Sequence, residues 1–293
     1  MSSIDLQKVH DDLVKVAKQA GEMIMAASPS VLQADNKKNS TDIVTETDKA
    51  VEVMIQKTLK DQYPDFEFYG EESYDPKIRL SDKPTFVCDP IDGTVNFVHG
   101  FPEVCTSLAL TIDKKSVVGV IYNPFYDRLF SAIKGKGSFL NLTTRLPLRK
   151  NPDPLTGLKN ALVAVEWGAD RTGNNFEVKH QTFTKLARVT EDGGAMVHSL
   201  RSIGSAAMNF CSVASGVLDL YWEGAAYAWD VSAGWLILSE TGGIVVDTNP
   251  GNWDVSLEER RYMAVRGAPS GQKEIVEEFW RNVVGKLDYA PGQ

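Results

Sequence analysis

The chain has few of the residues that build disulfide frameworks or transition-metal sites. Its 293 residues include three cysteines, without a Cys-x-x-Cys spacing, and four histidines, without a pair at helical or zinc-finger spacing. These counts argue against a disulfide-stapled fold and against a zinc site, and they fit a reducing compartment. We expect Cys88, Cys105 and Cys211 to be small buried apolar residues.

Long apolar segments are also missing. No run of about 18 apolar residues is present to cross a membrane. The first residues lack the basic and apolar parts of a signal peptide, Ser2 stands where myristoylation needs glycine, and the last residues are no lipidation box. We therefore expect a soluble, cytoplasmic protein with no membrane partner.

An excess of positive charge is the third absence. Lys and Arg total 31 against 39 Asp and Glu, which gives a net charge of −8, and no basic cluster stands out. Binding to nucleic acid through the phosphate backbone is disfavoured, because it needs a positive face. An acidic chain that handles an anionic substrate needs a bound cation or local hydrogen-bond donors.

Composition and periodicity predict a globular protein with both helices and strands, because 43% of the residues are hydrophobic and 24% are charged. Helices are expected at residues 6–24 (ended by Pro29), 48–63, 176–187, 206–217, 231–240 and 273–284. Strands are expected at residues 85–88, 106–112, 117–122, 129–133, 161–165, 218–222, 244–246 and 262–265. Loops or turns are expected at residues 36–42, 123–124 and 135–137.

The stretch 150–157, with two prolines and one glycine, is the best candidate boundary. It divides the chain into residues 1–150 and 151–293. We expect two αβ halves in one compact unit with a shared cleft, the first half carrying most of the metal ligands.

Five acidic residues occupy positions where solvated charges are not expected: Glu71, Glu72, Asp89, Asp92 and Asp230. Asp89 ends an apolar strand, and Asp92 follows it three residues later. A tight turn over residues 89–92 would aim two carboxylates and one backbone carbonyl at the same point. Oxygen ligands without Cys or His select hard cations such as Mg²⁺.

Simpler interpretations exist for some of these residues. Glu71 and Glu72 alone could be a solvated loop pair, and Asp230 could be a helix N-cap. The Asp89-Pro-Ile-Asp-Gly-Thr94 run is harder to explain in this way, because it places charges between two apolar segments. Gly93 and Thr94 offer free backbone N–H groups at a helix start, which would cradle a phosphate. No Gly-x-Ser-x-Gly elbow and no Ser/His/Asp set is present.

Three separated motifs occur in the chain in this order: Gly70-Glu-Glu-Ser73, Asp89-Pro-Ile-Asp-Gly-Thr94 and Trp229-Asp-Val-Ser-Ala-Gly234. With these motifs in the same order, the chain resembles the inositol monophosphatase family of magnesium-dependent, lithium-sensitive phosphatases. The resemblance extends to residues 42–48, 96–102 and 201–207 and covers essentially the whole chain. The resemblance implies an α+β fold, a layered αβαβα sandwich, and a homodimer. It also implies hydrolysis of myo-inositol monophosphates to inositol and phosphate, in inositol recycling or biosynthesis.

The resemblance further implies two Mg²⁺ ions held by oxygen ligands, which are Glu71, Asp89, the carbonyl of Ile91, Asp92 and Asp230. Asp89 would bind both ions, while Asp48 and Glu71 would support a third ion through waters. Two metals can clamp the attacking and leaving oxygens and lower the pKa of the attacking water, so that no side-chain nucleophile is needed.

The implied catalytic residues are Thr94, Asp48 and Glu72, and Thr94 with Asp48 would help to activate the water. Lys37 matches a basic residue near the entrance of the site. The implied substrate-binding residues are Glu71, Asp92, Gly93, Thr94, Gly204, Ser205, Ala206, Glu223 and Asp230.

Two positions bear on the choice of substrate. Relatives often have a ring-binding serine in a Gly-Ser-x-Arg stretch, whereas this chain has Gly168-Ala169-Asp170-Arg171 and lacks that hydroxyl. Glu223 stands seven residues before Asp230, so both could face one cleft. A carboxylate there would accept bonds from ring hydroxyls and repel a second phosphate, although Glu223 could also be a solvated residue at a strand end.

Three alternatives remain at this point. An aspartyl-phosphate phosphatase would have its second Asp two residues after the nucleophile, whereas Asp92 lies three after Asp89. A phosphatase of the same fold could act on a nucleotide bisphosphate or another sugar phosphate. A non-catalytic regulatory relative is the third, and the presence of all five ligand carboxylates argues against it.

Overall fold

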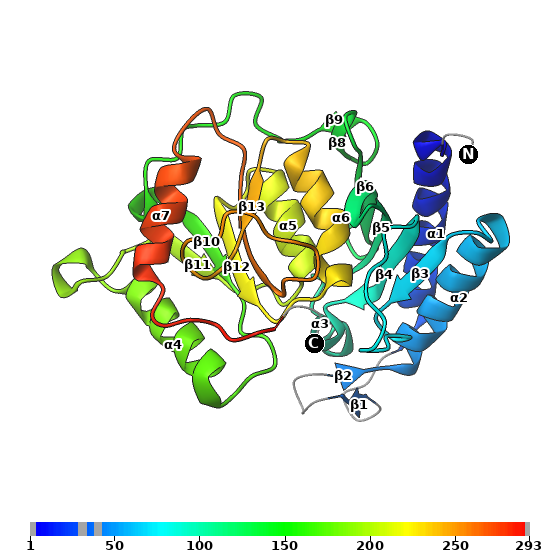
Figure 1. Ribbon diagram of the computed structural model, residues 1–293, viewed down its shortest axis with the longest axis horizontal. Helices are drawn as coiled ribbons and strands as arrows, with labels where there is room; N and C mark the ends of the chain where they lie inside the picture. Colours follow the sequence, from blue (N-terminus) through cyan, green and yellow to red (C-terminus); the bar gives the residue numbers. More distant parts are fainter. Residues whose placement is uncertain (1–3, 29–33, 38–42, 291–293) are drawn as a thin grey trace.

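Two β-sheets lie on either side of a central pair of helices, and further helices cover their outer faces (Figure 1). The computed structural model describes residues 4–28, 34–37 and 43–290. From one side to the other, the layers are helix, sheet, helix, sheet and helix. The predicted α+β fold, a layered αβαβα sandwich, is confirmed.

The first outer layer consists of α1 (Leu6–Ala26) and α2 (Glu46–Gln62), which bury an apolar face against the larger sheet. Asp5 caps α1 through the N–H groups of Gln7 and Lys8. Thr45 and Asp48 form a capping box that starts α2 at Glu46, two residues earlier than predicted. Helix α1 ends at Ala26; Pro29 and residues 38–42 of the predicted loop lie outside the described residues.

The larger sheet has seven strands in chain order: β3 (Glu67–Gly70), β4 (Thr85–Asp92), β5 (Cys105–Ile112), β6 (Lys115–Asn123), β7 (Arg128–Ile133), β8 (Gly137–Leu140) and β9 (Thr144–Arg145). Strands β3 and β4 are parallel, and each later pair is antiparallel. The turns predicted at residues 123–124 and 135–137 connect β6 to β7 and β7 to β8. A short hairpin pairs β1 (Asp35–Asn36) with β2 (Ile43–Val44).

The tight turn expected over residues 89–92 is a wrong prediction. Strand β4 continues to Asp92, and its register with β5 shifts between Asp89 and Asp92. Thr106 stabilises this irregular strand end, because its hydroxyl donates to the carbonyl of Pro90 at 2.9 Å. A bulge of this kind changes the direction of the side chains along a strand. The turn was expected to aim the carboxylates of Asp89 and Asp92 at one point, and the bulge does this instead.

The central layer consists of α5 (Ala206–Ala214) and α6 (Ala228–Ser239). Both helices are buried on nearly all sides because a sheet lies on each face. Gly119 of β6 permits the close approach of α6, since a Cβ at this position would lie 2.8 Å from the carbonyl oxygen of Ala233. The helix predicted at 206–217 ends three residues early, and the helix predicted at 231–240 begins three residues early, at Ala228.

The smaller sheet has the strand order β11-β10-β12-β14-β13. Its strands are β10 (Leu162–Val165), β11 (Ser199–Arg201), β12 (Leu220–Gly224), β13 (Ile244–Val246) and β14 (Arg261–Val265). Helices α4 (Gly173–Ala187) and α7 (Gln272–Asn282) cover its outer face. Strand β12 lies two residues beyond the predicted 218–222, which places Glu223 inside the strand rather than after it.

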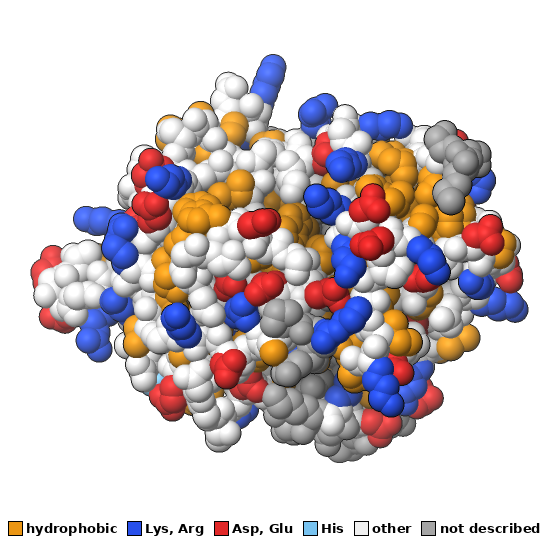
Figure 2. Space-filling model, in the orientation of Figure 1, with side chains coloured by type: hydrophobic (Ala, Val, Ile, Leu, Met, Phe, Trp, Pro, Cys, Tyr) orange, Lys and Arg blue, Asp and Glu red, His pale blue; other side chains and the backbone are white. Residues whose placement is uncertain are grey.

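Charge is mixed over the surface. On the face drawn in Figure 2, acidic and basic side chains alternate without separating into regions of one sign. In the part of the chain that the structure describes, no helix is both long and apolar enough to span a bilayer.

Candidate metal centre and active site

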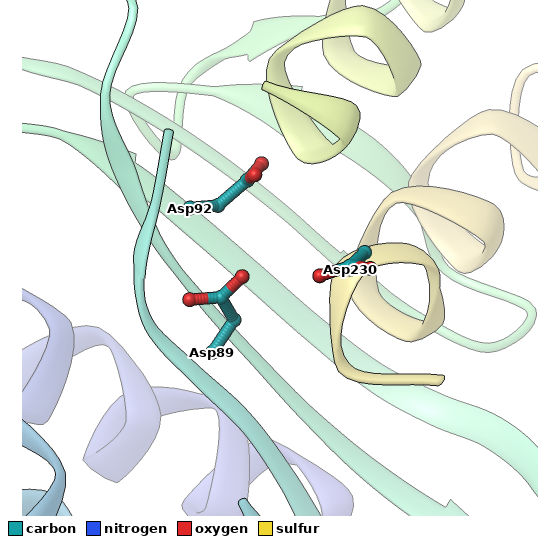
Figure 3. A group of neighbouring side chains, drawn as sticks. All are labelled: Asp89, Asp92 and Asp230. Atoms are coloured by element: carbon teal, nitrogen blue, oxygen red, sulfur yellow. The ribbon is translucent and has the colours of Figure 1, made fainter. Parts of the chain in front are cut away.

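Three aspartates from two elements converge on one point (Figure 3). Asp89 and Asp92 project from the irregular end of β4, and Asp230 projects from the first turn of α6. One carboxylate oxygen of each lies within 4.8 Å of the others. Asp89 is 2% exposed and Asp92 is 8% exposed, so these charges are removed from water.

Asp92 is held by the start of α5. Its Oδ2 accepts hydrogen bonds from the Ser205 hydroxyl and from the Ala207 N–H, each at 2.6 Å. Burial raises the pKa of Asp92 to about 6 in spite of these bonds. The bonds fix one oxygen of the carboxylate and thereby the direction of the other.

Asp230 does not precede its helix, so the suggestion that it is the N-cap is wrong. Because α6 begins at Ala228, Asp230 is the third helical residue, and its Oδ2 accepts the N–H of Tyr227 at 2.6 Å. Burial raises the pKa of Asp230 well above its usual range, and the nearby carboxylates Glu71 and Asp92 raise it further. The helix thus orients Asp230 toward the two aspartates of β4.

The electrostatics of the three aspartates fit a divalent cation. Burial and then the neighbouring carboxylates raise the pKa of Asp89 well above its usual range. Within the described ranges, no lysine or arginine forms an ion pair with Asp89, Asp92 or Asp230. Converging carboxylate oxygens without nitrogen or sulfur donors suit a hard cation, which would stabilise the ionised forms.

Glu71, Glu72 and Lys37 form a second charged group beside the aspartates. The Nζ of Lys37 lies 2.8 Å from a carboxylate oxygen of each glutamate. The glutamate side chains are only 24% and 9% exposed, so the suggestion of a solvated loop pair is wrong. Burial raises the pKa of Glu71 to about 7.

Asp48 and Thr94 come together from α2 and α3 (Thr94–His99), 46 residues apart in the chain. The Thr94 hydroxyl lies 3.0 Å from Asp48 Oδ1 and 3.1 Å from the carbonyl oxygen of Ile91. Burial raises the pKa of Asp48.

Gly93, before α3, has φ +91°, and a Cβ there would lie 2.8 Å from the carbonyl oxygen of Glu103. The position therefore needs glycine.

A cavity of about 460 Å³ extends from two of the three aspartates to the residues that the resemblance implies as substrate contacts. Asp92 and Asp230 line it, as do Gly204, Ser205, Ala206 and Glu223. Glu223 is half-buried and accepts a hydrogen bond from the Tyr221 hydroxyl, so it is not a solvated strand-end residue. Burial, and then the nearby Glu166, raise the pKa of Glu223 to about 8.

Sequence reasoning missed Glu166, which also lines this cavity. Its Oε1 accepts the N–H groups of Ile203 and Gly204 at 2.6 and 2.9 Å and the side-chain amide of Asn209 at 2.8 Å. These bonds shape the turn that precedes α5. A signal was available, because Glu166 directly follows an apolar strand, as Asp89 does.

The three cysteines are all buried and free, as predicted. Burial raises the thiol pKa of Cys88, Cys105 and Cys211 well above the usual value. They are therefore poor nucleophiles.

Comparison with known proteins extends these observations. A profile described as "Inositol monophosphatase family" matches residues 5–284. The chain is 44% identical to inositol monophosphatase 2 of Saccharomyces cerevisiae over 97% of this chain and 98% of the relative. It is 34% identical to inositol monophosphatase 1 of Bos taurus, with 94% of each chain covered.

A solved structure supports the same assignment. The extragenic suppressor protein suhB from Bartonella henselae is similar with a TM-score of 0.78 and 29% identity, over 96% of this chain and 100% of that chain. The family profile, the near-complete coverage of the relatives and the layered fold agree. The chain belongs to the inositol monophosphatase family.

Proposed function

We propose that the protein hydrolyses myo-inositol monophosphates to inositol and phosphate with Mg²⁺ as cofactor. The observation that carries the proposal is the convergence of Asp89, Asp92 and Asp230 next to a cavity that Asp92, Asp230 and Glu223 line. The family membership and the names of the yeast and bovine relatives support the reaction.

The metal ligands in this proposal are Glu71, Asp89, the carbonyl of Ile91, Asp92 and Asp230. Bound Mg²⁺ supplies positive charge for the phosphate and lowers the pKa of a water nucleophile. The Ile91 carbonyl oxygen lies 3.1 Å from the Thr94 hydroxyl oxygen. When the single hydroxyl hydrogen of Thr94 goes to Asp48, the lone pairs of the Ile91 carbonyl are open to a cation.

The catalytic residues are Thr94, Asp48 and Glu72. Asp48 accepts from the Thr94 hydroxyl, which leaves the threonine oxygen as an acceptor for the proton of an attacking water. Glu72 pairs with Lys37 and keeps this basic residue beside Glu71. The N–H groups of Gly93 and Thr94 hold the phosphate at the start of α3.

The remaining residues bind the inositol ring. Gly204, Ser205 and Ala206 form the wall that Glu166 shapes, and Glu223 accepts from neighbouring ring hydroxyls. In their ionised forms, the carboxylates of Glu223 and Glu166 disfavour a second phosphate group in this part of the cavity. This preference separates the proposal from a nucleotide or sugar bisphosphatase.

A phosphate-release assay on a panel of substrates tests the proposal. We expect inositol monophosphates to be hydrolysed far better than adenosine or sugar bisphosphates, with Mg²⁺ required and lithium inhibiting uncompetitively. A preference for a bisphosphate, or full activity in chelator, would contradict it. No hydrolysis of any substrate with Mg²⁺ would favour the regulatory relative, and phosphate trapped covalently on Asp89 would favour an aspartyl-phosphate phosphatase.

The proposal includes a cytoplasmic homodimer. Each subunit consists of two αβ halves, residues 1–150 and 151–293, that share the cleft. Ligands Glu71, Asp89 and Asp92 come from the first half and Asp230 from the second. Light scattering coupled to size-exclusion chromatography tests the dimer, for which a mass of about one 32.3 kDa chain would be the contradicting result.

A further inference from the structure

The chain after α7 returns along the molecule as an extended segment, residues 284–290, which we name the C-terminal strap (Figure 1). Two asparagine side chains bind its backbone. Asn175 accepts from the Asp288 N–H at 2.7 Å and donates to the Asp288 carbonyl at 3.0 Å. Asn249 makes the same pair of bonds with Leu287, both at 2.9 Å. The strap is therefore anchored at two successive residues.

The strap packs on the end of β12, directly beside Glu223. Leu287 and Tyr289 are 2% and 8% exposed. A Cβ at Gly224 would lie 2.6 Å from the Tyr289 ring and 2.7 Å from the Leu287 side chain. No side chain other than hydrogen fits at Gly224 without moving the strap, so the two segments are closely matched in shape.

Two residues with unfavourable backbone conformations lie next to this contact. Ala225 has φ +94° and Arg260 has φ +63°, which residues other than glycine rarely adopt. Two hydrogen bonds join these residues. The Ala225 N–H donates to the Arg260 carbonyl at 2.8 Å, and Arg260 Nη2 donates to the Ala225 carbonyl at 2.7 Å. The Arg260 guanidinium lies 3.7 Å from the Tyr227 ring centroid and 5.8 Å from that of Tyr289. Such strain persists where surrounding contacts hold it.

Tyr289 also reaches the cavity wall. Its hydroxyl donates to the carboxylate of Asp170, in the segment 168–171. Gly168 and Arg171 of this segment line the cavity, and Arg171 Nη1 donates to the Gly168 carbonyl at 2.6 Å. This is the segment in which Ala169 replaces the serine that relatives often have.

We propose that Tyr289 is a positioning residue for substrate binding, which acts by holding segment 168–171 through Asp170. The proposal rests on the proposed function and adds to it a determinant of affinity for the inositol ring. This chain lacks the serine hydroxyl, so binding of the inositol ring depends more on where the 168–171 backbone and Arg171 lie. The strap fixes their position.

The variant Tyr289→Phe tests this, because it removes the hydroxyl and keeps the ring that packs on Gly224. We expect KM for an inositol monophosphate to rise about tenfold, on the order of one lost hydrogen bond of substrate binding, with kcat nearly unchanged. Phenyl phosphate, which has no ring hydroxyls, should show no such rise. Asp170→Ala should also raise KM, and adding Tyr289→Phe to Asp170→Ala should give no further rise. Tyr126→Phe, at a tyrosine that is 46% exposed, is the matched control and should be unchanged.

A second measurement needs no substrate. Hydrogen–deuterium exchange in a peptide that covers residues 168–171 should be faster in Tyr289→Phe than in the wild type and unchanged in Tyr126→Phe. Unchanged exchange overturns the proposal, as does an unchanged KM in a wild-type background that hydrolyses inositol monophosphate. If the wild type does not hydrolyse this substrate, the proposed function fails and the exchange result alone decides the role of Tyr289.

Discussion

Replacing Asp92 by asparagine separates a metal ligand from a structural hydrogen-bond acceptor. The Ala207 N–H can only donate, so the asparagine must turn its carbonyl oxygen toward α5 to keep the 2.6 Å bond. Its NH₂ group then faces Asp89 and Asp230, where it cannot bind a cation. Asp92→Asn therefore keeps the contact with α5 and removes one ligand.

The structure sets the expected magnitudes. A metal that neutralises transition-state charge contributes several kcal/mol, and each 1.4 kcal/mol is tenfold in rate, so we expect kcat to fall about 1,000-fold or more. Stability should change in the opposite direction. Burial raises the pKa of Asp92 from 3.8 to about 6, which costs the ionised, metal-free protein on the order of 3 kcal/mol at pH 8. The neutral amide removes this cost.

Phosphate release and thermal unfolding in chelator at pH 8 measure the two effects. We expect Asp92→Asn to be inactive, to keep its circular dichroism spectrum and to have a Tm several degrees above that of the metal-free wild type. Asp153→Asn is the control: this side chain is 77% exposed, so both quantities should stay at the wild-type level. Near-normal activity at saturating Mg²⁺ would refute the ligand assignment. A Tm several degrees lower would show that Asp92 serves the fold instead.

Two further predictions concern pH and the substrate ring. The raised pKa values of Glu71 (about 7) and Asp92 (about 6) mean that the folded metal-free protein binds more protons than the unfolded chain between about pH 4 and pH 7, so its stability should fall as pH rises through this window. Mg²⁺ should therefore raise Tm more at pH 8 than at pH 5, and an equal rise at both would contradict the metal-site electrostatics. Glu223→Gln should weaken the preference for inositol monophosphates over bisphosphates more than it weakens Mg²⁺ dependence, in kcat/KM measured on both substrates. An unchanged preference would remove Glu223 as the reader of ring hydroxyls.

The first helix could be predicted because it buries one regular apolar face against the larger sheet. Residues 6–24 show helical spacing, and α1 occupies nearly the same range. The short strands β9 and β11 escaped prediction, since two or three residues carry no period and their pairing depends on strands elsewhere in the chain. Pro90 and Gly93 are typical of turns, so the sequence predicts a turn at the end of β4, whereas the pairing with β5 keeps the segment extended.

The site was predictable where a charge interrupts an apolar segment. Asp89 carries this signal at the end of a buried strand, and Glu166 carries the same signal, which was overlooked. Lys179 of α4 carries no such signal, although it supports the cavity wall. Its fully buried amine donates to the carbonyl oxygens of Trp167, which lines the cavity, and of Gly224, at 2.9 and 3.1 Å. Main-chain partners of this kind leave no trace in residue types, so only the folded structure reveals them.

The most direct test of the metal centre is anomalous diffraction from a crystal soaked with Mn²⁺, a hard cation with oxygen preferences similar to those of Mg²⁺. We predict an anomalous peak with carboxylate oxygens of Asp89, Asp92 and Asp230 as ligands, and loss of that peak in Asp92→Asn. A wild-type crystal with no peak among these three aspartates, under conditions in which Mn²⁺ supports phosphate release, would contradict the account.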